Sequence, residues 1–84
     1  MFKVNWTEKS LWQLEKLQSL VSSRIIKKVN ELTENPFSKI KRLKGIDSFS
    51  LRVGDYRTIL DIDVKNKIIY VLRLGHRKNI YEKD

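Results

Sequence analysis

The sequence lacks cysteine entirely and holds one histidine, one proline and three glycines in 84 residues. Without cysteine, the chain forms neither disulfide bonds nor thiolate metal sites. The carboxylates are scattered and the glycines stand singly at Gly45, Gly54 and Gly75, so neither a metal-ligand cluster nor a glycine-rich phosphate-binding loop is recognisable. No serine stands beside the histidine with an orienting acid, which excludes the usual hydrolase templates. We therefore expect no metal and no small-molecule cofactor.

Long hydrophobic runs are also missing. The apolar runs are only a few residues long, whereas a membrane-spanning helix needs about 20. The first ten residues, MFKVNWTEKS, lack the apolar segment of a secretory signal. These absences, together with the lack of cysteine, predict a cytoplasmic protein with no membrane partner. The length predicts a single domain, residues 1–84, that buries about 60–65% of its unfolded surface.

Negative charge is scarce relative to positive charge. Lys and Arg number 18 against 10 Asp and Glu, which gives a net charge of +8. From Pro36 onward there are twelve basic and six acidic residues, whereas residues 1–35 hold six and four. Such a surplus points to a polyanion or an acidic protein as partner. A solubilising surface is the alternative that charge alone leaves open.

The first half of the chain has the pattern of one strand and two helices. Residues 2–6, FKVNW, alternate apolar and polar side chains, as in a half-buried strand. Thr7 is a plausible N-cap for a helix to about Leu20, and Ser22–Ser23 for a second helix that ends at Asn35–Pro36. The two helices should pair as a hairpin, with two apolar stripes in the core. These stripes are Leu11, Leu14 and Leu17 with Trp12 beside them, and Ile25, Ile26, Val29 and Leu32.

The second half has the pattern of three strands, at 49–53, 60–64 and 68–74. Gly54–Asp55 fits a two-residue hairpin loop and Lys65–Lys67 a three-residue loop. This register sets Arg52 opposite Arg57. It also places Phe49, Leu51, Leu60, Ile62, Val64, Ile68, Tyr70 and Leu72 on the core face. The predicted fold class is α+β, in the order β-α-α-β-β-β, with an antiparallel sheet and an N-terminal helix hairpin packed on one face.

The opposite face of this sheet carries a cluster of arginines. The register places Ser50, Arg52, Arg57 and Arg73 there, with His76 and Arg77 emerging beside Arg57 as the last strand ends. Two arginines directly opposite each other oppose folding by a few tenths to about 1 kcal/mol. A guanidinium binds phosphate through two parallel hydrogen bonds, so an anionic ligand would explain the arrangement. The alternative is that each side chain extends separately into solvent.

Three further features bear on a nucleic-acid ligand. His76 is the one side chain suited to proton transfer near neutrality, although a lone histidine after a strand is often structural. Tyr81 can stack on an exposed base or simply cover an edge of the core. The stretch KIKRLK is a candidate RNA-binding segment or a site for an acidic partner, and a solvated loop would look the same. Its cations are Lys39, Lys41, Arg42 and Lys44.

Three motifs together resemble the RelE/ParE superfamily of toxin–antitoxin toxins: RLKG at 42–45, LRVGDYRTIL at 51–60 and LGHRKNIY at 74–81. The resemblance covers the whole chain in length and element order. It implies a toxin of a type II toxin–antitoxin system, a RelE-like mRNA interferase that cleaves mRNA on the ribosome without a metal. Cleavage would proceed by attack of the ribose 2′-OH on the adjacent phosphate, and an acidic, RelB-like antitoxin would inhibit the toxin.

The resemblance also implies roles for individual residues. Arg57 corresponds to a phosphate or transition-state contact, Arg77 to an arginine that supports the leaving group or the phosphate, and Tyr81 to a tyrosine that engages the nucleotide. Arg52 and Ser50 occupy two positions that are lysine in the RelE-type pattern. Because serine supplies no cation, the identity of the general base stays open between His76 and a lysine such as Lys44.

Two alternatives to the nuclease are compatible with the sequence. The first is a ParE-like toxin that inhibits DNA gyrase and has no nuclease activity, a reading that Ser50 favours. The second is a non-catalytic relative that only binds RNA or its antitoxin. The combination of Arg57, His76, Arg77 and Tyr81 favours the nuclease.

Overall fold

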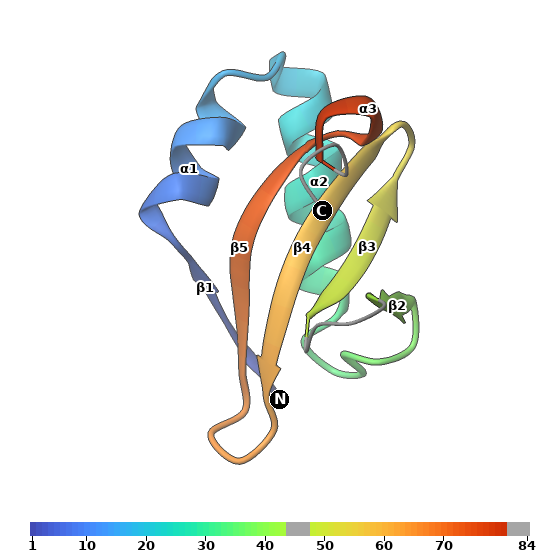
Figure 1. The fold of residues 1–84 in the computed structure, drawn as a ribbon. Coiled ribbons are helices and arrows are strands. Elements are labelled where there is room, and N and C mark those ends of the chain that lie inside the picture. Colours follow the sequence, from blue (N-terminus) through green and yellow to red (C-terminus); the bar gives the residue numbers. More distant parts are fainter. Residues whose placement is uncertain (44–47, 81–84) are drawn as a thin grey trace.

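A computed structural model of the protein describes residues 1–43 and 48–80. The elements within these ranges form a five-stranded sheet in the order β1-β5-β4-β3-β2, with α2 behind it and α3 on the near side in Figure 1. The elements are β1 (Lys3–Trp6), α1 (Glu8–Glu15), α2 (Ser19–Glu31), β2 (Ile40–Arg42), β3 (Phe49–Val53), β4 (Tyr56–Asp63), β5 (Ile68–His76) and α3 (Arg77–Ile80). The α+β fold class is confirmed.

Two features of the sheet differ from the sequence prediction. β1 pairs in parallel with β5, so that Val4 lies opposite Ile69 and Trp6 opposite Val71, and the sheet is mixed rather than wholly antiparallel. β2, which was not predicted, adds a strand beyond β3. The apolar alternation locates a strand along the chain, but the identity and direction of its neighbour depend on contacts between distant segments.

The core lies between the sheet and the two N-terminal helices, as predicted. The helices contribute Leu14, Ile25, Val29 and Leu32, and the sheet contributes Leu51, Val53, Leu60, Ile69, Val71 and Leu74. Neither α1 nor α2 nor α3 has the length and apolar content that a membrane crossing requires.

The helix boundaries and part of the apolar stripes differ from the prediction. Thr7 is the N-cap of α1, and its Oγ1 accepts a hydrogen bond from the Ser10 amide at 3.2 Å. α1 ends at Glu15 and α2 starts at Ser19, so the serines expected to separate the helices lie inside α2. Three residues that their spacing placed in the core are exposed. They are Leu11, Trp12 and Ile26. The reason is that α1 and α2 each present only one narrow apolar stripe to the sheet.

The pairing of β4 with β5 changes register at one point. Ile59 lies opposite Arg73, but Leu60 lies opposite Val71, so Leu72 is an extra residue in β5. Such a β-bulge reverses which residues beyond it face the core. The predicted pairing of Leu60 with Leu72 is therefore wrong.

The bulge has a tertiary cause. The Thr7 hydroxyl lies 2.9 Å from the Val71 carbonyl oxygen and 3.1 Å from that of Leu72. A further contact from α1 comes from Gln13, whose Oε1 accepts a hydrogen bond from the Leu74 amide at 2.7 Å. α1 thus satisfies backbone groups of β5 on both sides of the extra residue, which offsets the disrupted ladder.

Beyond the bulge, Ile69 and Val71 enter the core, while Ile68, Tyr70 and Leu72 are only half-buried. β4 ends at Asp63, so the loop to β5 comprises residues 64–67 rather than the three residues expected. Val64, predicted to lie in the core, is 58% exposed in this loop.

Candidate functional site

The site begins at the tight turn between β3 and β4. Gly54 has φ +59, a conformation that glycine adopts without strain, and the two-residue loop holds Arg52 directly opposite Arg57 as predicted. Arg52 Nε donates to the Gly54 carbonyl at 3.2 Å and Arg57 Nη1 to the Tyr56 carbonyl at 3.3 Å. Within residues 1–43 and 48–80, neither guanidinium pairs with a carboxylate. Both retain donors for a ligand.

These two arginines line a cavity of about 590 Å³ on the outer face of the sheet, which we call the arginine pocket. β2 and the segment before it supply the facing wall. The lining residues are Lys39, Lys41, Arg42, Leu43, Ser50, Arg52 and Arg57. Five of these seven side chains are cationic, which makes the cavity a site for an anion. Three of the residues predicted to bind RNA, in the segment 39–42, and two of the three predicted catalytic arginines, Arg52 and Arg57, therefore line one pocket.

β2 explains how these two sets of residues meet. Ile40 packs against the core opposite Leu51, so the next residue, Lys41, lies on the outer face opposite Ser50. The Arg42 guanidinium lies over the Phe49 ring, 5.8 Å from its centroid. Phe49 in turn contacts Phe37 edge to face. The single isoleucine between two lysines was the only sequence signal for this strand.

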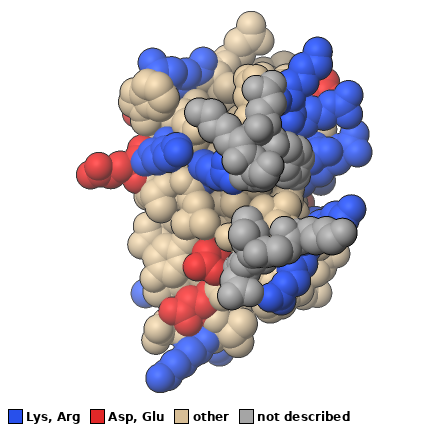
Figure 2. Space-filling model, in the orientation of Figure 1, with Lys and Arg blue, Asp and Glu red and all other residues tan. Residues whose placement is uncertain are grey.

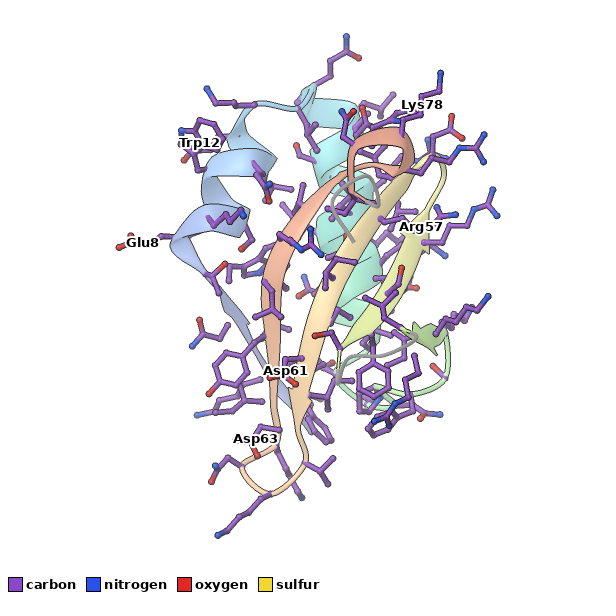
Figure 3. The ribbon with its side chains drawn as sticks, in the orientation of Figure 1. Glu8, Trp12, Arg57, Asp61, Asp63 and Lys78 are labelled. Carbon is purple, nitrogen blue, oxygen red and sulfur yellow. The ribbon has the colours of Figure 1, made fainter. Side chains whose placement is uncertain are left out.

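Charge is unevenly distributed over this face. Figure 3 shows Arg57 near the upper end of β4 and Asp61 and Asp63 toward its lower end. In the same orientation, Figure 2 shows Lys and Arg side chains gathered on the side that carries β3. Hydrogen bonds from the Asn66 side chain and backbone hold the pKa of the Asp63 carboxyl below its ordinary value. This carboxylate lies at the end of β4 and does not line the arginine pocket.

His76 lies outside this pocket. Its ring contacts the Tyr56 ring edge to face, with the centroids 5.5 Å apart, and its Nδ1 accepts a hydrogen bond from the Lys78 amide at 3.2 Å. Tyr56 lies opposite both His76 and Val53, which places these side chains on the core side of the sheet. Because Arg57 is the next residue, its side chain lies on the other side.

The remaining predicted residues lie near the end of β5. Arg77 begins α3, its side chain is exposed, and its amide donates to the Asp55 carbonyl at 2.8 Å. This bond ties the end of β5 to the β3–β4 turn. Arg73 Nη1 lies 3.4 Å from the Ile80 carbonyl oxygen, and the Ile80 side chain packs over Gly75. Lys44 and Tyr81 lie outside the described residues.

The part of the chain that the structure describes has no evident metal-binding site. No three His, Asp or Glu side chains of residues 1–43 and 48–80 are placed to hold a metal ion. The cluster of cations around Arg57 is suited to contacting a phosphate directly, through guanidinium and ammonium donors.

Comparisons with known proteins agree with this architecture. The family model described as "ParE toxin of type II toxin-antitoxin system, parDE" matches residues 4–81. No curated protein sequence matches the chain.

Solved structures of RelE toxins are similar over nearly the whole chain. The RelBE2 toxin–antitoxin complex from Mycobacterium tuberculosis contains a chain of 26% identity and TM-score 0.84, with 90% of this chain and 98% of that chain covered. For the archaeal RelE–RelB complex from Pyrococcus horikoshii, the identity is 25%, the TM-score 0.81 and the coverage 93% and 97%. The isolated RelE toxin of E. coli, at 23% identity and TM-score 0.81, covers 99% of this chain and 94% of its own, and shows the same fold.

The family match spans nearly all of the chain, including β1, the arginine pocket and α3. The protein therefore belongs to the ParE toxin family of type II toxin–antitoxin systems, within the RelE/ParE superfamily.

Proposed function

We propose that this toxin is a ribosome-dependent mRNA endoribonuclease that needs no metal ion. The observation that carries the proposal is the pocket in which Arg52 and Arg57 meet three cations of the β2 region. Two guanidiniums directly opposite each other are costly for folding, and a bound phosphodiester offsets that cost. The likeness to RelE toxins solved with their antitoxins supports this choice among the activities of the superfamily.

In the proposed reaction, the ribose 2′-oxygen attacks the adjacent phosphorus. The bond from phosphorus to the 5′-oxygen of the next nucleotide breaks, which leaves a 2′,3′-cyclic phosphate and a 5′-hydroxyl. The proton of the 2′-OH passes to a base and the 5′-oxygen gains a proton. Arg57 and Arg52 stabilise the charge that grows on the phosphoryl oxygens, and one such donor is worth about 100- to 1000-fold in rate.

The ribosome supplies the other large contribution, which is positioning. In-line attack requires the 2′-oxygen, the phosphorus and the leaving oxygen to be aligned, and contacts to one phosphate alone do not fix this alignment in a flexible strand. The roles of Arg77 at the leaving group, of Tyr81 at the nucleotide and of His76 as base stay predictions.

The proposed partners are the translating ribosome with its mRNA and an acidic, RelB-like antitoxin, all in the cytoplasm. The net charge of +8 favours both RNA and an acidic polypeptide. The similar toxins from M. tuberculosis and P. horikoshii were solved as complexes with an antitoxin. Co-expression with the adjacent reading frame should yield a co-purifying complex, and an adjacent product without net negative charge would count against this partner.

The test is cleavage of a defined mRNA on programmed ribosomes by the purified toxin, mapped by primer extension. We expect cuts at specific positions that require the ribosome and persist in EDTA, and that are lost in Arg57→Ala. An intact message after incubation with folded wild-type toxin would overturn the proposal.

A ParE-like gyrase inhibitor is the second candidate. Two observations favour it: the matching family model is that of ParE toxins, and the His76 ring contacts Tyr56 outside the arginine pocket. A supercoiling assay with purified gyrase decides between the two, because inhibition of supercoiling without mRNA cleavage identifies the gyrase inhibitor.

A further inference from the structure

The inner end of the arginine pocket has an unusual composition. Ser50 lies on β3, between β4 and the edge strand β2, is only 7% exposed and lines the cavity. A serine side chain is short, so it leaves space above it, but it carries no charge for an anion that enters this space. The positive charge at this point must come from a neighbouring strand.

Lys41 is the residue opposite Ser50 in the β2–β3 ladder. Residues directly opposite in antiparallel strands have Cβ atoms about 5 Å apart, and diagonal neighbours such as Lys41 and Arg52 are about 7–8 Å apart. An ammonium on a four-carbon stem spans this distance easily. Lys41, Arg52 and Arg57 all line the same cavity around Ser50.

The other cations of the β2 region are placed differently. Arg42 lies over the Phe49 ring, and Lys39 precedes the strand, so the ladder does not fix its position. The Lys41 side chain makes no hydrogen bond or ion pair with another residue of 1–43 and 48–80. Its position is thus fixed by the sheet while its charge is available to a ligand.

We propose that Lys41 binds directly to the RNA phosphate that Arg52 and Arg57 hold, and that Ser50 forms the floor beneath this phosphate. The inference rests on the proposed RNA substrate. It moves Lys41 from a general RNA-tracking role to the reacting centre. The ammonium donates to a non-bridging oxygen, where negative charge grows as the 2′-oxygen attacks.

Lys41 then supplies the positive charge that a lysine at the position of Ser50 on β3 would supply, and Ser50 leaves the space for it. A cation rooted on β2 reaches the phosphate from the side opposite Arg57, so the phosphoryl oxygens are contacted from both walls of the pocket. This arrangement accounts for a short strand that exposes two of its three side chains.

The test compares Lys41→Met with Lys39→Met, which removes the same charge from the same pocket at a position outside the β2–β3 ladder. Lys41→Arg restores the charge. Binding is measured by fluorescence anisotropy with a 2′-O-methyl RNA oligonucleotide, which lacks the attacking hydroxyl, over a series of salt concentrations. Cleavage is measured on programmed ribosomes.

We expect Lys41→Met to reduce the salt slope of binding by about 0.7, the value of one phosphate contact on a single strand. Cleavage should fall about 100-fold, as for the loss of one donor to the reacting phosphate. Lys39→Met should lose less cleavage than Lys41→Met, and Lys41→Arg should recover most of the loss. Lys27→Met, which removes an exposed lysine of α2 outside the pocket, is the control that should keep wild-type cleavage. In an Arg57→Ala background the effect of Lys41→Met on binding should shrink, because the two side chains share one phosphate.

Equal cleavage by Lys41→Met and Lys39→Met, with wild type active, would overturn the role of Lys41 and leave the nuclease intact. If wild type cuts no mRNA while Lys41→Met still weakens RNA binding more than Lys39→Met, the phosphate contact stands and the nuclease fails. Equal binding by both variants would overturn the phosphate contact itself.

Discussion

The two halves of β4 pair with β5 in two different registers. The half next to the Gly54 turn, Tyr56–Ile59, pairs with Arg73–His76, and its Arg57 lines the arginine pocket. The distal half, Leu60–Asp63, pairs one residue out of step with it and contributes Leu60 to the core. The local Gly54 turn sets the pairing of the first half with β3, whereas Thr7, more than 60 residues away in sequence, bonds to the β5 backbone at the shift.

The difference shows what a strand pattern can and cannot fix. A hairpin with a two-residue loop determines its own pairing, so the meeting of Arg52 and Arg57 follows from a ten-residue segment. A bulge adds one residue and reverses all later side chains, and here it depends on contacts from α1. Each half makes predictions that test this division.

The largest expected effect concerns Ile68 and Ile69, the two adjacent isoleucines of β5 that pair with the distal half of β4. Ile69→Ala should reduce the free energy of unfolding by about 2–5 kcal/mol, because the bulge places this side chain at 0% exposure in the core. Ile68→Ala, an identical change one residue earlier, should cost less than half as much, since Ile68 is only half-buried. Urea denaturation of both variants measures the difference. Equal losses, or a larger loss at Ile68, would contradict the shifted register.

The next prediction concerns Arg57 in the turn-proximal half. Arg57→Ala should reduce mRNA cleavage about 100- to 1000-fold, or about 3–4 kcal/mol in activation free energy. The same change removes a like-charge pair with Arg52, so thermal stability should hold or rise by a few tenths of a kcal/mol. Arg24→Ala, which removes an exposed arginine of α2, is the control and should leave cleavage unchanged. Undiminished cleavage by Arg57→Ala would remove the arginine from the mechanism.

Much of the fold follows from the sequence because its signals are local. Alternation located β3, the Gly54 turn set Arg52 opposite Arg57, and Thr7 capped α1 as predicted. β2 escaped because three residues with one apolar side chain carry almost no periodicity.

The site was only partly predictable for the same reason. That Arg52 and Arg57 lie opposite each other follows from one turn, but their meeting with Lys41 requires β2 to pair with β3. The position of His76 beside Arg57 in the sequence register suggested one cluster. Adjacent positions along a strand face opposite sides, and the register pairs His76 with Tyr56 instead.

A smaller effect is expected at His76, which pairs with Tyr56 at the start of the turn-proximal half. If the ring serves the edge-to-face contact with Tyr56, His76→Ala should reduce the free energy of unfolding by about 0.5–1.5 kcal/mol. His76→Phe should keep that stability and also keep mRNA cleavage. The two variants are compared by thermal unfolding and on programmed ribosomes. Equal loss of cleavage in both folded variants would instead establish the imidazole as the proton acceptor that the sequence suggests.

The smallest expected effect lies at the far end of the distal half, in the β4–β5 loop. Asn66 Nδ2 donates to Asp63 Oδ2 at 2.8 Å and the Asn66 amide donates to Oδ1 at 3.1 Å, which lowers the pKa of the Asp63 carboxyl. Because the pKa is lower in the folded state, the stabilisation is present above the unfolded pKa of about 3.9 and is lost as pH falls through the folded value.

Asn66→Ala removes the side-chain donor, so it should unfold at a slightly lower temperature than wild type at pH 7. The gap should narrow as pH falls through the folded pKa of Asp63 and close once the carboxyl is protonated in both proteins. Lys65→Ala, a change in the same loop, is the control and should show no such closing gap. A gap that stays constant as pH falls from 7 until the Asp63 carboxyl is protonated would show that Asn66 stabilises the loop by means other than the Asp63 carboxylate. The distal register would then be supported by the bulge, the core and its own turn, without a contribution from the Asp63 carboxylate.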